Sequence, residues 1–138
     1  MRCLSLTVVA FALASQFTIG LASATAADSI GDLRKQKLAW AEKWYTAITV
    51  AYEAGTVELK NVYAASVGLK NASYELATDK PHRVAALQAH RDRMDSLSQK
   101  IDALAAVMAK GGEGEKVAPA HFWLAEAKIW LLEEKAKP

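Results

Sequence analysis

The sequence predicts an all-α fold: elongated antiparallel helical hairpins that form a four-helix, coiled-coil-like bundle after an N-terminal signal peptide. Three observations predict it. Residues 27–138 are dominated by alanine, leucine, lysine and glutamate, which are strong helix formers. Apolar residues recur at spacings of three and four, the period of an amphipathic helix. Gly55, Pro81 and the run KGGEGEK at 110–116 separate the periodic segments.

Residues 1–26 have the pattern of an export signal. Arg2 supplies a basic start, residues 4–21 are mainly apolar, and ASATA at 22–26 contains an A-x-A cleavage pattern. A membrane-spanning anchor is the alternative, but hydroxyl and amide side chains dilute the apolar run. We therefore expect one exported domain, residues 27–138, in the periplasm or cell envelope, with no membrane span in the mature chain.

Composition excludes several classes of function for the mature chain. The single cysteine, Cys3, lies inside the signal, so residues 27–138 have no disulfide, thiolate metal site or cysteine nucleophile. Of the 17 basic residues only Arg2 is lost with the signal, which leaves 16 against 15 acidic residues and a formal charge of +1. This balance offers no basic excess for binding nucleic acid or an anionic membrane.

The first helix is expected at residues 30–54. Ser29 or Asp32 is its N-cap, and Gly55 ends it because glycine can adopt the left-handed C′ conformation without steric cost. Two neighbouring columns give this helix a broad apolar face: Ile30, Leu33, Lys37, Trp40, Trp44, Ala47, Ala51 and Ala54 in one, and Leu38, Tyr45, Ile48 and Tyr52 in the other.

Three further helices are expected at residues 58–77, 81–110 and 119–135. Asp79 can cap the third helix, and Pro81 and Pro119 suit first-turn positions, where a missing N–H has no intrahelical partner in any case. Short connections between helices predict antiparallel neighbours.

The third helix has the most regular apolar seam. Its residues step by alternating threes and fours, a 3.5-residue period that predicts coiled-coil-like packing along the whole helix. The seam consists of Leu87, His90, Met94, Leu97, Ile101, Leu104 and Met108.

The sequence also repeats itself at an offset of 55 residues. The repeat is either a duplication or a chance match between alanine-rich segments. The identical pairs are Ala51/Ala106, Ala54/Ala109, Val62/Val117, Ala65/Ala120, Leu69/Leu124, Ala72/Ala127 and Leu76/Leu131.

The stretch YEAGTVELKNVYAASVGLKNASYELA, residues 52–77, resembles the helix-turn-helix repeat of outer-membrane efflux proteins of the TolC type. The residues that carry the resemblance are Ala54, Gly55, Val57, Val62, Leu69, Ala72, Glu75 and Leu76. A degraded second copy, residues 114–131, matches through Gly114, Val117, Leu124, Glu126 and Ala127.

Two departures limit what this resemblance implies. Glu58 and Ala118 replace the family's polar residue at the start of the second helix, which weakens the N-cap. Efflux channels of this type also carry membrane-spanning β-strands, and the chain has no alternating segment of about 10 residues of that kind. The resemblance therefore implies a truncated helical hairpin module, without the β-barrel, and not a complete channel.

The histidines are the candidates for a metal site. His90 and Met94 lie one helical turn apart, and His82 lies two turns before His90, so a soft metal could meet them together with His121. The alternative is that His90 is a packed seam residue. The chain has no H-x-x-x-H or H-x-x-E-H motif, and we predict no metal or other cofactor.

The fourth helix is apolar around more than half of its circumference. Trp123 and Trp130 lie one heptad apart, and Phe122 and Ile129 flank them. This helix either packs centrally, with Trp40 and Trp44 of the first helix as candidates to face it, or binds a second copy or another protein.

The sequence thus predicts an exported, non-enzymatic binding or assembly module that resembles TolC-type efflux proteins, with a role in efflux or envelope organisation. Its partner would bind at Trp123, Trp130, Phe122 and Ile129. No nucleophile elbow, phosphate loop or pair of carboxylates in an apolar setting predicts an enzyme. The alternative function is a periplasmic metal- or stress-sensing protein, or a chaperone-like one.

Overall fold

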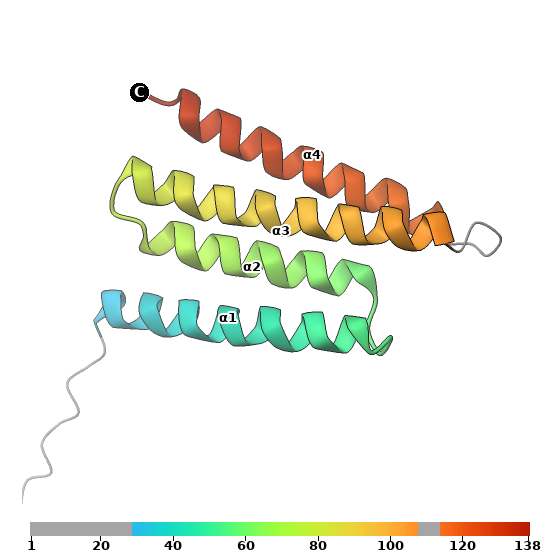
Figure 1. Cartoon of the computed structure of the whole chain (residues 1–138). Coiled ribbons are helices and arrows are strands. Elements are labelled where there is room, and N and C mark those ends of the chain that lie inside the picture. Colours follow the sequence, from blue (N-terminus) through green and yellow to red (C-terminus); the bar gives the residue numbers. More distant parts are fainter. Residues whose placement is uncertain (1–28, 108–113) are drawn as a thin grey trace, which may run out of the picture.

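The computed structural model describes residues 29–107 and 114–138, and these form four α-helices (Figure 1). The predicted export signal, residues 1–26, lies outside the described residues. The helices are α1 (Ile30–Glu53), α2 (Leu59–Leu76), α3 (Lys80–Val107) and α4 (Gly114–Ala136). They lie side by side in chain order with alternating direction, and the closely packed pairs are α1/α2, α2/α3 and α3/α4. The prediction of an all-α helical bundle is confirmed.

Both ends of α1 follow from local chemistry. The Ser29 side chain accepts a hydrogen bond from the backbone N–H of Asp32 at 3.1 Å, which caps the first turn. At the other end Gly55 has φ 72°. Its N–H donates to the Tyr52 carbonyl, and the N–H of Thr56 donates to the Ala51 carbonyl, both at 2.9 Å. This pair of bonds is the Schellman motif, so the predicted glycine stop is confirmed.

The starts of α2 and α3 differ in how well they are capped. Glu58 is the N-cap of α2 and makes no side-chain capping bond, as its replacement of a short polar residue predicts. In contrast, Asp79 accepts a hydrogen bond from the backbone N–H of His82 at 2.9 Å. Pro81 therefore lies in the first turn of α3, where an N–H group would have no intrahelical hydrogen-bond partner in any case.

The predicted start of the fourth helix at residue 119 is wrong, because α4 begins at Gly114 and Pro119 lies inside it. The first four N–H groups of a helix have no intrahelical partner, so one turn can form ahead of the proline. Pro119 then removes a single hydrogen bond. Val117 and Ala120 both pack against the core, and their burial compensates for that lost bond.

The core lies between α2, α3 and α4, with α1 packed on one side. The α3 seam is buried from Leu87 to Ile101, as predicted, whereas Leu104 is exposed and Met108 lies outside the described residues. Tyr45, Ile48 and Tyr52 of α1 pack against this core from outside. The central cluster consists of Leu59, Val62, Met94, Leu97, Ile101, Ala120, Leu124 and Ala127.

Small residues of the repeated seam occupy the tightest positions. Ala65 and Ala72 of α2 are fully buried, and so are their repeat partners Ala120 and Ala127 of α4. Both copies of the repeat therefore turn the same face toward the interior. A methyl side chain at these positions lets the helix backbones approach closely.

A glycine has the same effect between α1 and α2. A Cβ atom at Gly68 would lie 2.7 Å from Cζ3 of Trp44, so the indole ring rests on bare backbone in the middle of α2. This contact holds Trp44 against α2 and explains a glycine at a position where alanine is the better helix former.

Gly68→Ala therefore tests the packing of α1 on α2. Alanine is the better helix former and should raise the stability of the protein by up to about 1 kcal/mol when Trp44 is absent. When Trp44 is present, the new methyl group displaces the indole ring, which cancels this gain. We expect no gain in the wild-type chain and a gain in the Trp44→Ala background, measured by urea denaturation of the four proteins. Equal effects in the two backgrounds would show that the ring does not contact Gly68.

Candidate binding surfaces

The largest run of exposed apolar side chains lies on α1. One apolar column, with Ala41, Tyr45 and Ile48, faces the bundle, and the other lies at the flank of α1, where Trp44 covers Gly68 of α2. Trp40 is 68% exposed and Trp44 is half exposed. We call the exposed column the outer stripe of α1; it consists of Leu33, Lys37, Trp40, Trp44 and Ala47.

This stripe corrects the expectation that Trp40 and Trp44 face the fourth helix. The closely packed neighbour of α1 is α2, and α4 is the outer helix on the far side of the bundle (Figure 1). The sequence pattern indicated one broad apolar face and did not separate the two columns of α1. Lys37 was the available signal, because a lysine within an apolar column marks the solvent side; its ammonium group binds Glu75 of α2 at 2.7 Å.

The predicted partner-binding residues of α4 separate into two groups. Trp123 stacks on Tyr63 of α2 with ring centroids 4.6 Å apart, and Trp130 stacks on His90 of α3 at 5.6 Å. Both tryptophans are half-buried inside the chain. Phe122 and Ile129, by contrast, are exposed, at 65% for Phe122. Contact of these four residues with a partner stays a prediction, and only Phe122 and Ile129 are free for it without rearrangement.

A cavity of about 1070 Å³ opens at the end of the bundle where α1 turns into α2 and where α3 ends and α4 begins. We call it the end cavity. Its inner wall includes Leu59, which is buried, and Trp123, which is half-buried. Its outer wall includes the exposed residues Leu104 and Val107. Charged side chains also line it, namely Lys60, Lys100, Lys116, Glu53 and Glu58.

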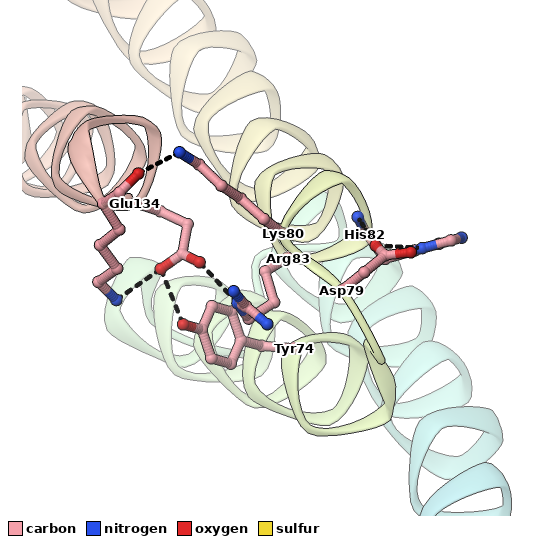
Figure 2. Close-up of polar contacts among 7 residues, drawn as sticks. Tyr74, Asp79, Lys80, His82, Arg83 and Glu134 are labelled. Carbon is pink, nitrogen blue, oxygen red and sulfur yellow. Dashed lines mark hydrogen bonds and ion pairs between the residues drawn. The ribbon is translucent and has the colours of Figure 1, made fainter.

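A polar cluster occupies the opposite end of the bundle. Figure 2 shows Tyr74 of α2 and Arg83 of α3 pointing at the carboxylate of Glu134 on α4. Tyr74 Oη donates to Glu134 at 2.8 Å, and Arg83 Nε and Lys137 Nζ each donate at 2.6 Å. Glu134 is 1% exposed, so these donors satisfy a buried carboxylate.

The charge of Glu134 follows from these contacts. The hydrogen bonds from Lys137 and Arg83, and then that from Tyr74, lower the pKa of Glu134 to about 2. Because this pKa lies below the ordinary value of 4.5, the carboxylate contributes stability above pH 4.5 and loses that contribution as the pH falls toward 2. Through these bonds the Glu134 carboxylate joins α4 to α2 and α3.

His90 lies in a second buried polar group, between α2 and α3. Its Nδ1 atom is 2.9 Å from the Ser66 hydroxyl, which also accepts a hydrogen bond from Arg93 Nε at 2.8 Å. Its Nε2 atom has no hydrogen-bond partner among the residues that the structure describes. Burial, followed by the charges of Arg93 and Lys70, lowers the pKa of His90 to about 3.

The structure separates His82 and His121 from each other and from the other two candidate ligands, His90 and Met94. His82 is exposed and pairs with Asp79 at 2.6 Å, whereas His121 contacts Asp102 at 3.0 Å. Since α3 rises about 1.5 Å per residue, Asp79 and Asp102 lie roughly 35 Å apart. His90 and Met94 are buried between these two sites. Within residues 29–107 and 114–138, no three His, Cys, Asp or Glu side chains are grouped to hold a metal ion.

The chain matches no protein-family model, no curated protein and no solved structure. In the part of the chain that the structure describes, no helix is both long enough and apolar enough to cross a membrane.

The pKa of His90 predicts a specific loss of stability in mild acid. The unfolded chain binds a proton at this side chain near pH 6.5, whereas the folded chain does so only near pH 3. Stability should therefore be full above pH 6.5 and fall below it by up to about 1.4 kcal/mol per pH unit.

His90→Gln keeps a group that can bond to Ser66 but does not titrate. The free energy of unfolding is measured by urea denaturation at about pH 7.5 and about pH 5 for both proteins. The decrease between the two pH values should be larger in the wild type than in the variant, by about 2 kcal/mol. Equal losses in the two proteins would mean that His90 is not kept neutral by burial.

Proposed function

We propose that the mature chain is an exported, non-enzymatic assembly module that associates with a second copy of itself through the outer stripe of α1. The observation that carries this proposal is the exposure of Trp40 and Trp44, together with Leu33, along one line of a single helix. Monomeric proteins rarely expose large apolar patches, and such surfaces usually form interfaces.

The spacing of the stripe suits a helix of another copy. The residues of the outer stripe and the half-buried Ala51 that follows them step by four and three in alternation, which is the seam of a coiled coil. Each helix of such a pair needs a facing seam with the same period. The same stripe on a second chain supplies a seam with this period.

Size complementarity favours an antiparallel pair. The spacings between successive seam residues are the same from either end of the helix. A two-fold axis near residue 42 therefore places each seam residue opposite another. Leu33 then faces Ala51, and Trp40 faces Trp44. The bulky half of one helix thus meets the alanine half of the other. Lys37, which would face Ala47, keeps its charge paired with Glu75 of its own chain.

The resemblance to the TolC-type helical repeat and the predicted export signal support a location in the periplasm or cell envelope. In that setting the module would contribute to efflux or to envelope organisation through its assembly. The second candidate function, a chaperone-like protein, is favoured by the same exposed apolar surface and would use it for unfolded clients. Metal sensing has less support, because His82 and His121 pair with separate carboxylates.

Light scattering coupled to size-exclusion chromatography tests the proposal directly. We expect the purified mature protein to be a dimer at micromolar concentration. Trp40→Glu should weaken dimerisation by more than about 100-fold, since it places a charge at the centre of the interface. Helix content should not change, because the side chain is exposed in the single chain.

Val50→Glu is the matched control, because Val50 is exposed on the same helix but lies off the stripe. It should leave the dimer intact. A wild-type protein that is monomeric at about 100 μM would contradict the proposed dimer. Equal dissociation by the two substitutions would show that the stripe is not the interface.

A further inference from the structure

We infer that the outer face of α4 is a second site of self-association, at which two copies of the chain pair their α4 helices in parallel. We call this face the outer seam of α4; it consists of Ala118, Phe122, Ala125, Ile129, Leu132 and Ala136. The inference does not depend on pairing through α1, because α1 and α4 lie at opposite edges of the bundle (Figure 1).

The outer seam is apolar along its whole length and lies in solvent. All of its residues are exposed, and the three large ones, Phe122, Ile129 and Leu132, are 65%, 53% and 64% exposed. The buried residues of α4, such as Leu124 and Leu131, lie on another face, roughly 150° away around the helix at about 100° per residue. The bundle therefore leaves the outer seam uncovered, and this seam contains no charged residue, unlike the outer stripe of α1.

The period of the outer seam is that of a two-stranded coiled coil. Its residues step by four and three in alternation. This spacing makes Ile129 an a position and Leu132 a d position of the heptad. A β-branched residue at a with leucine at d favours a parallel pair of helices. The seam therefore suits one further helix that presents the same residues in the same direction.

The residues that flank the outer seam carry opposite charges. Glu126 and Glu133 follow the d positions, whereas Lys128 and Lys135 precede the a positions, so one flank is acidic and the other is basic. In a parallel pair the basic flank of each helix meets the acidic flank of the other. In an antiparallel pair each flank would meet its own kind, and like charges repel. The flanking charges therefore favour a second copy in the parallel direction.

Lys128 and Glu133 are the residues that would form ion pairs across this interface. In a parallel pair Lys128 of one chain lies beside Glu133 of the other, and two-fold symmetry forms the contact twice. Both side chains are exposed, and neither forms an ion pair within the part of the chain that the structure describes. Glu126, one heptad earlier, already accepts a hydrogen bond from Tyr63. The pairing specificity therefore rests on Lys128 and Glu133.

The same charges favour a second α4 over the outer stripe of α1. The charged residues beside that stripe, Arg34 and Lys43, are both basic. A pair of α1 with α4 would leave Lys128 without an acidic partner, whereas a pair of two α4 helices satisfies Lys128 and Glu133 together. Two-fold pairs at α1 and at α4 lie on opposite edges of the bundle, so both contacts together would join copies into a continuing chain.

Sedimentation equilibrium of the mature Trp40→Glu chain tests the inference, because this substitution disrupts the outer stripe of α1 and leaves α4 intact. Half of the outer seam is alanine, so we expect weak pairing, with a dimer that forms between about 10 μM and about 1 mM. In the wild-type chain the same contact should raise the mass above that of a dimer over this range. A Trp40→Glu chain that is monomeric at about 1 mM would overturn the inference.

A seam substitution in the Trp40→Glu chain locates the contact. Leu132→Asp places a charge within the seam and should weaken pairing by about tenfold or more. Leu104→Asp is the matched control, because Leu104 is an exposed leucine of α3 and lies off the outer seam. It should leave pairing unchanged. Equal weakening by the two substitutions, or no weakening by Leu132→Asp, would overturn the inference.

Charge reversal tests the partner and the direction of pairing. Lys128→Glu and Glu133→Lys each place like charges opposite one another in a parallel pair, and each should weaken pairing by about fivefold at low salt. The double variant restores opposite charges and should pair like the parent chain. Lys135→Glu is the matched control, because α4 ends at Ala136 and no helical residue would face position 135 across a parallel pair. A double variant as weak as the single ones would overturn the inference.

The two proposed contacts fail independently of each other. If the wild-type and Trp40→Glu chains associate alike and both respond to Leu132→Asp, the α4 contact is supported and the α1 dimer is contradicted. Dissociation of the wild-type chain by Trp40→Glu, with no effect of Leu132→Asp on either chain, would support the α1 dimer and overturn the α4 contact.

Discussion

The buried carboxylate of Glu134 is the interaction on which the arrangement of α2, α3 and α4 depends. A buried charge is tolerated only when donors surround it, and its donors here come from Tyr74 of α2, Arg83 of α3 and Lys137 after α4. All three segments must therefore meet at one register. The Ser66–His90–Arg93 group imposes a similar requirement between α2 and α3. Hydrophobic packing alone would permit more than one sliding position of these helices, and the two polar groups remove that freedom.

Small side chains determine how closely the helices approach once this register is set. Alanines of the repeated seam are fully buried on both α2 and α4, and Gly68 accepts the ring of Trp44 directly on its backbone. The bulky residues that fill the interior come chiefly from α3, including Met94 and Ile101. Large side chains from the middle of the bundle thus meet small ones on its neighbours, which is the usual solution for close packing of helices.

The bundle has more apolar surface than its own contacts cover. α1 packs one column against the core and leaves the outer stripe largely exposed, although Trp44 also contacts Gly68 of α2, and the end cavity exposes a second apolar area at the turns. The proposed pairing of two chains would cover the stripe. The Glu134 cluster at the opposite end, in contrast, has its hydrogen bonds satisfied within the chain.

Local sequence determined the helices, because the chemistry that starts and stops them lies within a few residues: Ser29 for the start of α1, Gly55 for its end and Asp79 for the start of α3. The period of α3 likewise identified its buried seam from Leu87 to Ile101. Tertiary structure alone decided which column of α1 faces inward, that α4 begins before Pro119, and that Glu134 and His90 are buried. Periodicity defines an apolar face within one helix, but the neighbour that covers it is set by contacts between residues far apart in sequence. Two of the three partners of Glu134, Tyr74 and Arg83, lie 60 and 51 residues away, beyond the reach of any local pattern.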